Sequence, residues 1–282
     1  VDAVTGEVLG DLIPPGAHGL SAPDDLVIGP DGALYVSSGC PTRFGQRCDP
    51  SIPSRVLRVD PRTGALLGVA AEAPELWRPY GLAFASDGTL YVASFANDRV
   101  LRFGPDGALL GVLDAAGPAD ARRPGELNGP NDLLLRDGRL YVTTEGAVND
   151  DGVLTFPGLP SEILVYDLQT GAKEVWAAAA PVGGGPPPSF VGMALDDGGR
   201  MYVTDYMSPW VVGLDVGGQV AQRLQIARPP GGYTGAAAWD PRVGLAVVWG
   251  DDADPSAGGV WTQRGGPREL GLDRPIGVVV AP

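Results

Sequence analysis

Short runs of alternating apolar and polar residues recur along the chain, separated by turns rich in Gly, Asp and Pro. The clearest copy spans residues 78–114, with alternating runs at 81–84, 89–93, 99–103 and 108–113. Alternation with a period of two is typical of half-buried strands, and Asp-Gly turns favour hairpins between them. The pattern therefore predicts four short antiparallel strands in this copy.

The segment that opens this unit recurs along the chain. Six openings align, beginning at Pro23, Pro79, Pro130, Phe190, Tyr233 and Pro275. A four-stranded sheet of this size cannot bury both of its faces alone, so each copy must pack against its neighbours. The sequence predicts an all-β fold, a single six-bladed β-propeller domain over residues 1–282 with four-stranded antiparallel blades.

The two ends of the sequence carry parts of one blade. Residues 1–10, VDAVTGEVLG, match residues 59–68, VDPRTGALLG, which end the first blade. We expect residues 1–16 to complete the last blade, a closure that removes a free sheet edge. That blade lacks a second strand and most of a third, so we expect the sequence to be part of a longer protein.

Three stretches are longer than the repeat requires, at residues 39–54, 145–160 and 177–189. The first of them carries both cysteines of the chain, Cys40 and Cys48, with no further Cys or His beside them. A disulfide that pins this loop is the preferred interpretation and points to an oxidising compartment. Two reduced surface thiols are the alternative.

The charge balance narrows the class of partner. The chain has 34 acidic and 20 basic residues, a net charge of −14, which argues against nucleic acid or an anionic membrane as partner. The alternative is that the net negative charge only keeps the protein soluble. No apolar run is long enough to cross a bilayer, so we expect no membrane insertion.

The repeat units resemble NHL repeats. The openings PNDLLLRDGRLYVTT and PYGLAFASDGTLYVAS are similar to those of a wider group of six-bladed propellers. That group includes the senescence-marker-protein/gluconolactonase family, diisopropylfluorophosphatase-like and paraoxonase-like hydrolases, and strictosidine-synthase-like proteins. The resemblance covers nearly the whole chain, but the repeated residues mostly build strands and turns, so it speaks to fold more than to activity.

The resemblance also implies a candidate cation site. Hydrolases of this group hold a divalent cation, usually calcium, in the central tunnel with ligands placed where the blades open. The equivalent tunnel-lining positions here are Asp24, Tyr80, Asn131, Val191, Thr234 and Ile276. Asp24 and Asn131 match the acid or amide ligands that calcium requires, whereas Thr234 offers a hydroxyl and Val191 offers nothing.

Other interpretations of these residues stay open. Asp25 and Asp132 are equally suited to tying adjacent turns, as Asp often does. A further loop residue, for example Glu145 or Asp150, is an alternative ligand that would complete a shifted site.

The single histidine is a weak candidate for catalysis. His18 lies on the connection into the first blade, from which it would act as a base toward a bound ester. The sequence shows no orienting partner for it, and no nucleophile elbow of the G-x-S-x-G type is present. A surface histidine without a catalytic role is the alternative.

Two functions from different classes compete. The preferred hypothesis is a secreted, non-catalytic binding or structural module that holds a protein or glycan partner on one face of the propeller. The broken ligand set favours it. The alternative, supported by Asp24 and Asn131, is a calcium-dependent lactonase or esterase of the gluconolactonase-like group.

Overall fold

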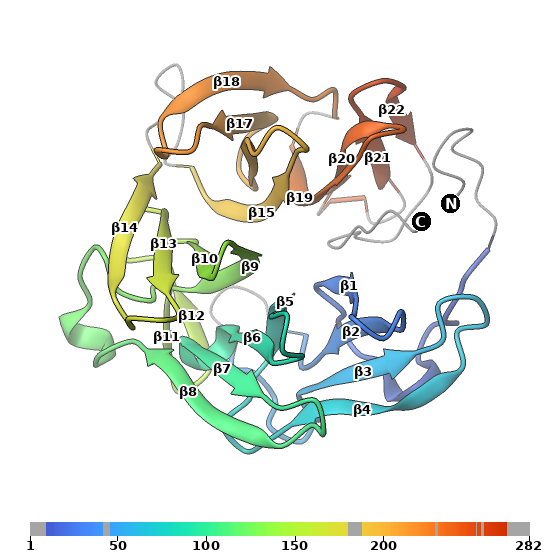
Figure 1. The fold of residues 1–282 in the computed structure, drawn as a ribbon, viewed down its shortest axis with the longest axis vertical. Coiled ribbons are helices and arrows are strands. Elements are labelled where there is room, and N and C mark those ends of the chain that lie inside the picture. The colour runs from blue at the N-terminus through green and yellow to red at the C-terminus, as the bar shows by residue number, and fades with distance from the viewer. Residues whose placement is uncertain are drawn as a thin grey trace. The chain divides into compact units, whose positions relative to one another are not determined.

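The computed structural model describes residues 10–41, 46–179, 188–228, 231–251, 253–254 and 257–269. Within them the chain forms five four-stranded antiparallel sheets, with three short 3-10 helices and one additional two-stranded hairpin (Figure 1). These sheets are the blades of the predicted propeller. The chain divides into two compact units, a larger unit of residues 11–178 and a smaller unit of residues 1–10 with 179–282.

The larger unit contains blades one to three. Blade one is β1 (Leu26–Ile28), β2 (Leu34–Ser38), β3 (Arg55–Val59) and β4 (Leu66–Glu72). Blade two is β5 (Pro79–Phe84), β6 (Leu90–Ser94), β7 (Arg99–Phe103) and β8 (Leu109–Ala115). Blade three is β9 (Pro130–Arg136), β10 (Arg139–Thr144), β13 (Glu162–Asp167) and β14 (Lys173–Ala178). The hairpin β11 (Val148–Asp150) and β12 (Val153–Thr155) is inserted between β10 and β13.

The smaller unit contains blades four and five. Blade four is β15 (Phe190–Leu195), β16 (Met201–Asp205), β17 (Trp210–Leu214) and β18 (Val220–Gln225). Blade five is β19 (Gly232–Asp240), β20 (Gly244–Asp251), β21 (Gly259–Thr262) and β22 (Gly266–Glu269). The 3-10 helices, η1 (Ala17–Gly19), η2 (Phe95–Asn97) and η3 (Ala119–Ala121), all belong to the larger unit.

The four-stranded antiparallel blades are confirmed by this pairing, and five of the six predicted blades are seen. The opening predicted for a sixth blade, at residues 275–282 with Ile276, lies outside the described residues, as do residues 1–9. The sixth blade therefore stays a prediction.

Antiparallel order brings several connections to one end of each blade. The chain runs up the first strand, down the second, up the third and down the fourth. The loop after the second strand and the link to the next blade therefore both lie where the first strand begins, an end that we call the opening end. The long loops at 39–54 and 145–160 both follow a second strand, so each lies at the opening end of its blade.

The first strand of blades two to five contains a β-bulge, which changes the direction of the chain there. In blades two to four, two residues of the first strand stand opposite one residue of the second: Tyr80 and Gly81, Asn131 and Asp132, Val191 and Gly192. In blade five the bulge falls at Gly235 and Ala236, one position after Thr234. Such bulges disrupt the ladder locally and turn side chains out of the sheet, so the pairing gives these positions a common geometry.

The first strands of neighbouring blades approach so closely that glycine is required between them. A Cβ atom on Gly81 would lie 2.6 Å from the Cα of Asp132 in the next blade. In the smaller unit, a Cβ atom on Gly192 would lie 2.6 Å from the Cα of Ala236. Backbone cannot yield as a flexible side chain does, so these contacts fix the spacing of adjacent blades.

Apolar side chains fill the spaces between adjacent blades. Leu82, Leu101 and Phe103 of blade two pack with Tyr35 and Val56 of blade one. The opposite face of blade two packs on blade three in a second cluster of buried residues: Ala83, Tyr91, Ala93, Val100, Leu127, Leu133, Leu140, Val142, Leu164 and Tyr166. Within the larger unit, adjacent blades thus cover faces that neither could bury alone.

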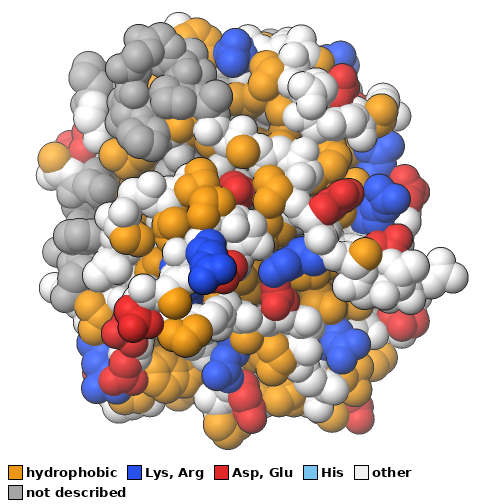
Figure 2. All heavy atoms as spheres, turned by 90° about the vertical axis from the view of Figure 1, so that its left-hand side faces the viewer, with side chains coloured by type: hydrophobic (Ala, Val, Ile, Leu, Met, Phe, Trp, Pro, Cys, Tyr) orange, Lys and Arg blue, Asp and Glu red, His pale blue; other side chains and the backbone are white. Residues whose placement is uncertain are grey.

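The outer strands are more exposed and carry mixed charges. Leu110 of β8 is 55% exposed and Val175 of β14 is 43% exposed. The face in Figure 2 shows basic and acidic side chains interspersed among apolar ones, with no large patch of one sign. Among the described residues, no helix is both long and apolar enough to cross a membrane.

We predict that Gly81→Ala destabilises the protein by about 2 kcal/mol or more, because the new methyl group meets backbone atoms of β9. Gly117→Ala is the matched control, since the nearest atom to its Cβ would be 3.8 Å away and belongs to a flexible Glu126 side chain. Urea denaturation of the two variants and the parent measures the difference. Equal midpoints for the two variants would contradict the close approach.

Candidate functional site

The opening end of the larger unit brings two of the predicted site residues into one polar cluster. Asp24 stands just before β1, and Asn131 lies in the bulge of β9. Two further residues join them, Arg78 just before β5 and Glu145 just after β10. We call Asp24, Arg78, Asn131 and Glu145 the charge cluster.

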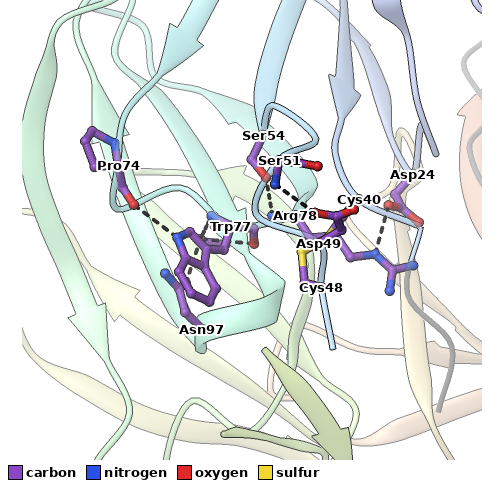
Figure 3. The surroundings of a disulfide bond; sticks show 11 residues. Asp24, Cys40, Cys48, Asp49, Ser51, Ser54, Pro74, Trp77, Arg78 and Asn97 are labelled. Atoms are coloured by element: carbon purple, nitrogen blue, oxygen red, sulfur yellow. Dashed lines mark hydrogen bonds and ion pairs between the residues drawn. A yellow bond between two sulfur atoms is a disulfide. The ribbon is translucent and has the colours of Figure 1, made fainter. Parts of the chain in front are cut away.

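Asp24 is a buried carboxylate with few partners. Its side chain is 4% exposed, and neither of its oxygens accepts a hydrogen bond. The nearest charge is the Nε atom of Arg78, 3.8 Å from its Oδ2 atom (Figure 3). Burial raises the pKa of Asp24 to about 7, opposed by Arg78 and reinforced by the charges of Glu145 and Asp25. Burial therefore disfavours the charged form of this carboxylate, and ionisation of Asp24 lowers the stability of the folded protein.

Glu145 is the second acid of the cluster. Its Oε1 atom accepts a hydrogen bond from the Nδ2 atom of Asn131. Burial raises the pKa of Glu145 to about 7, against the opposing effects of that hydrogen bond and of Arg78. Glu145 was an open alternative at the sequence level, and the return of the chain after β10 is the signal that places it beside Asn131.

Arg78 supplies positive charge to both acids from a strained position. Its φ is 50°, a left-handed conformation that is uncommon for a long side chain. The guanidinium lies 4.7 Å from the ring centroid of Tyr80, which is itself stacked on Phe95. The Arg78 amide donates to Ser54 Oγ at 2.9 Å, so the long loop of blade one holds its backbone. No feature of the sequence pattern singles out Arg78, although it directly precedes the opening at Pro79.

Asp25 has the structural role that was its alternative interpretation. Its Oδ2 atom accepts a hydrogen bond from the amide of Leu82 at 2.8 Å, and its Oδ1 atom accepts one from Leu26 at 2.7 Å. These bonds tie the start of β1 to β5. Burial raises the pKa of Asp25 to about 6 while both hydrogen bonds lower it. Asp132 repeats part of this pattern, accepting from the Leu133 amide at 2.7 Å.

The remaining tunnel-lining candidates that are described lie in the smaller unit. Val191 is 7% exposed in the bulge of β15. Thr234 is fully buried and donates its hydroxyl to the carbonyl of Ser208 at 3.0 Å. By pairing register, Gly235 rather than Thr234 matches Asn131. Neither Val191 nor Thr234 therefore presents a free acidic or amide oxygen.

His18 is held on the outer part of blade one. Its Nε2 atom is 2.9 Å from the carbonyl of Gly64, in the turn between β3 and β4. That turn is at the opposite end of the blade from Asp24, because the third strand runs away from the opening end. The structure therefore does not bring His18 to the charge cluster.

The long loops of blades one and three meet at the opening end. The predicted disulfide between Cys40 and Cys48 is formed, with both residues buried. The Cys48 amide donates to the carbonyl of Gly152, in the β11–β12 hairpin, at 2.9 Å, and Arg47 pairs with Val153 in an isolated bridge. We call the contact between the disulfide loop, 39–54, and the β11–β12 hairpin the clasp.

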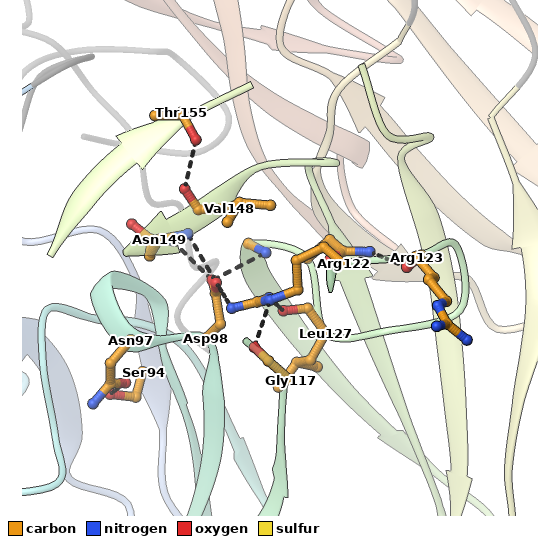
Figure 4. A network of polar contacts seen from close by, with 12 residues as sticks. Ser94, Asn97, Asp98, Gly117, Arg122, Arg123, Leu127, Val148, Asn149 and Thr155 are labelled. Carbon is orange, nitrogen blue, oxygen red and sulfur yellow. Dashed lines mark hydrogen bonds and ion pairs between the residues drawn. The ribbon is translucent and has the colours of Figure 1, made fainter. Parts of the chain in front are cut away.

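A buried aspartate secures the hairpin from the other side (Figure 4). Asp98, between β6 and β7, is fully buried and accepts hydrogen bonds from the amide and the Nδ2 atom of Asn149 at 2.9 and 2.8 Å. Arg122 donates to the same carboxylate at 2.8 Å, as does Gly129 at 3.2 Å. Asp98 thus joins blade two, the link to blade three and the hairpin, which explains its burial as a charged group.

The calcium that the resemblance implies does not fit this cluster. The Arg78 guanidinium already lies beside the carboxylate that would bind the ion, and two cations at that distance repel each other. Asn131 turns its amide nitrogen, not its oxygen, toward Glu145. Among the described residues, no group of three or more His, Cys, Asp or Glu side chains is arranged to hold a metal.

Comparison with known proteins supports the fold. The sequence matches no protein-family model and no curated protein. Solved structures do match: a gluconolactonase from Xanthomonas campestris has a TM-score of 0.61 and 16% identity over 90% of this chain and 77% of that one. A nidogen/laminin complex gives 0.58 and 16% over 86% and 77%, and a virginiamycin B lyase from Staphylococcus aureus gives 0.54 and 14% over 90% and 72%. Identities this low establish a shared propeller fold and no shared activity.

We predict that Asp24→Asn stabilises the protein at pH 8 by about 1–3 kcal/mol. The pKa of Asp24 in the folded state is about 7, above its ordinary 3.8, so its favourable contribution is complete below pH 4 and lost as the pH rises through 7. Asn does not ionise, so the gain should grow between pH 4 and pH 7 and then level off. Thermal unfolding at a series of pH values measures it.

Asp60→Asn is the control for that series. Asp60 is half-buried in a turn, and hydrogen bonds from the amides of Arg62 and Thr63 lower its pKa, so its replacement should not stabilise the protein at pH 8. A stabilising effect of Asp24→Asn that does not vary with pH would contradict the assignment of the gain to ionisation.

We also predict that replacing both cysteines by Ala lowers the free energy of unfolding by about 2–3 kcal/mol, because the disulfide closes a loop between residues eight apart. Arg47→Ala should cost little, because Arg47 and Asp151 form an ion pair with both side chains more than half exposed. Urea denaturation gives both values. Hydrogen exchange at the amides of β11 and β12 should accelerate in the cysteine variant only.

Proposed function

We propose that this chain is a non-catalytic binding module whose partner docks at the opening end of the larger unit. The proposal rests on the position of Arg78 beside the two acids of the charge cluster. Its guanidinium supplies, from within the chain, the positive charge that a metal supplies in the related hydrolases. A cluster that is already compensated in this way has no need of a Lewis acid and is suited to recognition.

Two further observations support binding. The clasp fixes the loops around the cluster, and rigid loops lower the entropic cost of association. One structural neighbour was solved as a complex of nidogen with laminin, an example of this fold in a protein assembly.

We further propose that the protein is secreted and that residues 275–282 with 1–16 form part of a sixth blade. The disulfide supports an oxidising compartment, since such bonds are rare in the cytosol. The repeat of the opening sequence at Pro275 supports a further blade. A partner of protein or glycan type at the opening end fits an extracellular setting.

A hydrolase of lactones or esters is the second candidate. The pKa values of about 7 for Asp24 and Glu145 are those that suit a general base near neutral pH. In that case Glu145→Gln would abolish hydrolysis of simple lactones at pH 7 while leaving the fold intact. Under the binding proposal, the parent protein shows no hydrolysis above the buffer rate, with or without added calcium.

We predict that calorimetric titration of calcium into chelator-treated protein gives no binding in the parent and weak binding in Arg78→Met. The substitution removes the competing charge and leaves two carboxylates and one amide, a set that should bind with a dissociation constant of about 100 µM. Asn131→Ala added to Arg78→Met should weaken it. Micromolar binding by the parent, lost in Asn131→Ala alone, would overturn the proposal in favour of the hydrolase.

A further inference from the structure

A pocket lies at the opening end of the larger unit, beside the clasp. It is a pocket of about 370 Å³, within the usual range for small-ligand sites. It is lined by Pro74, Glu75, Trp77, Asn97, Arg99, Asp151 and Gly152. None of these residues belongs to the charge cluster, so the pocket is a separate site.

Three connections build the pocket. The link between blades one and two contributes Pro74 to Trp77, the segment from η2 into β7 contributes Asn97 and Arg99, and the turn of the inserted hairpin contributes Asp151 and Gly152. Asp151 and Gly152 have φ values of 47° and 77°, as a two-residue type I′ turn requires. The clasp and Asp98 hold this turn in place, so the pocket wall is fixed before any ligand arrives.

Trp77 gives the pocket an apolar wall. Its indole packs against the buried cluster of Cys40, Cys48 and Ala96. The indole Nε1 atom donates to the carbonyl of Pro74 at 3.1 Å (Figure 3). The Trp77 amide donates to Ser94 Oγ at 2.7 Å. Because its one polar atom is already used, the indole offers carbon surface to a ligand.

The other lining side chains give the pocket a polar edge of both signs. Asn97 is oriented by donating to the Glu75 carbonyl at 2.8 Å and accepting from Ser94 Oγ at 2.7 Å. Glu75 and Arg99 take part in no ion pair within the part of the chain that the structure describes. Asp151 is paired with Arg47 at 2.8 Å. Acceptors and donors therefore surround one aromatic surface.

We propose that this pocket binds the pyranose ring of a neutral sugar, which would make the partner a glycan. The inference rests on the proposed binding function and specifies its ligand. A pyranose has one apolar C–H face, which suits the Trp77 indole, and hydroxyls that donate to carboxylates and accept from guanidinium and amide groups. A cationic ligand would face Arg99, and an anionic one would face Glu75 and Asp151, so a neutral ligand meets the least repulsion.

The test is NMR titration with methyl glucoside, methyl galactoside, methyl mannoside and N-acetylglucosamine as separate probes. The indole N–H signal of Trp77 is assigned by its loss in Trp77→Phe. At least one sugar should shift this signal with a dissociation constant of about 1 mM, typical of a single small ring. Trp77→Leu and, separately, Glu75→Ala should weaken that affinity at least about fivefold. In Trp77→Leu, which has no indole signal at this position, the backbone amide signal of Gly152, another lining residue, reports the affinity.

Trp210→Leu is the matched control, because this tryptophan lies in β17 of the smaller unit and outside the pocket. It should leave the sugar affinity unchanged. The inference fails if no sugar moves the Trp77 signal up to about 100 mM. It also fails if binding persists in Trp77→Leu, or if N-acetyl-lysine amide binds more tightly than every sugar.

The sugar titration and the calcium titration test different proposals, so a negative result in one does not decide the other. Parent protein that binds neither calcium nor sugar loses the sugar pocket but keeps the proposed binding function. Parent protein that binds calcium at micromolar concentration loses the proposed function at the charge cluster, whatever the Trp77 signal shows.

Discussion

The clasp is the contact on which the opening end of the larger unit depends. Blades one and three are not neighbours, yet the disulfide loop of one and the hairpin of the other meet through the Cys48–Gly152 hydrogen bond. Each loop alone would be a long, mobile insertion with a large entropy to lose. Joined, they position Ser54 against Arg78 and Gly152 against Trp77, and so organise both candidate sites.

The charge cluster lowers the stability of the folded protein. Two acids with pKa values near 7 and an arginine with a left-handed backbone are each unfavourable in isolation. A buried ion pair with an Nε to Oδ2 distance of 3.8 Å recovers only part of that cost. Residues that lower stability in this way concentrate at functional sites, because selection retains them for recognition or chemistry.

Arginine and a metal ion are alternative ways to compensate the same carboxylates. The structural neighbours include a gluconolactonase, a virginiamycin B lyase and a nidogen/laminin complex, so the fold by itself does not indicate one activity. The covalently attached cation is our reason for proposing a binding role here, since a guanidinium cannot exchange its ligands for a substrate as a metal can.

The sequence by itself determined the four-stranded antiparallel blades and favoured the disulfide. Strand alternation and Asp-Gly turns are local properties, and the repeat forces each copy to pack on the next, so the four-stranded units and the opening positions could be predicted. The closeness of Cys40 and Cys48 in one loop, with no further Cys or His beside them, favoured a disulfide over two thiols, and the structure contains the bond. Only the tertiary structure decided that Arg78 and Glu145 join Asp24 and Asn131, and that Thr234 is one position out of register. Those outcomes depend on bulges, on a left-handed backbone and on contacts between loops about a hundred residues apart, such as Cys48 with Gly152, which leave no periodic trace in the sequence.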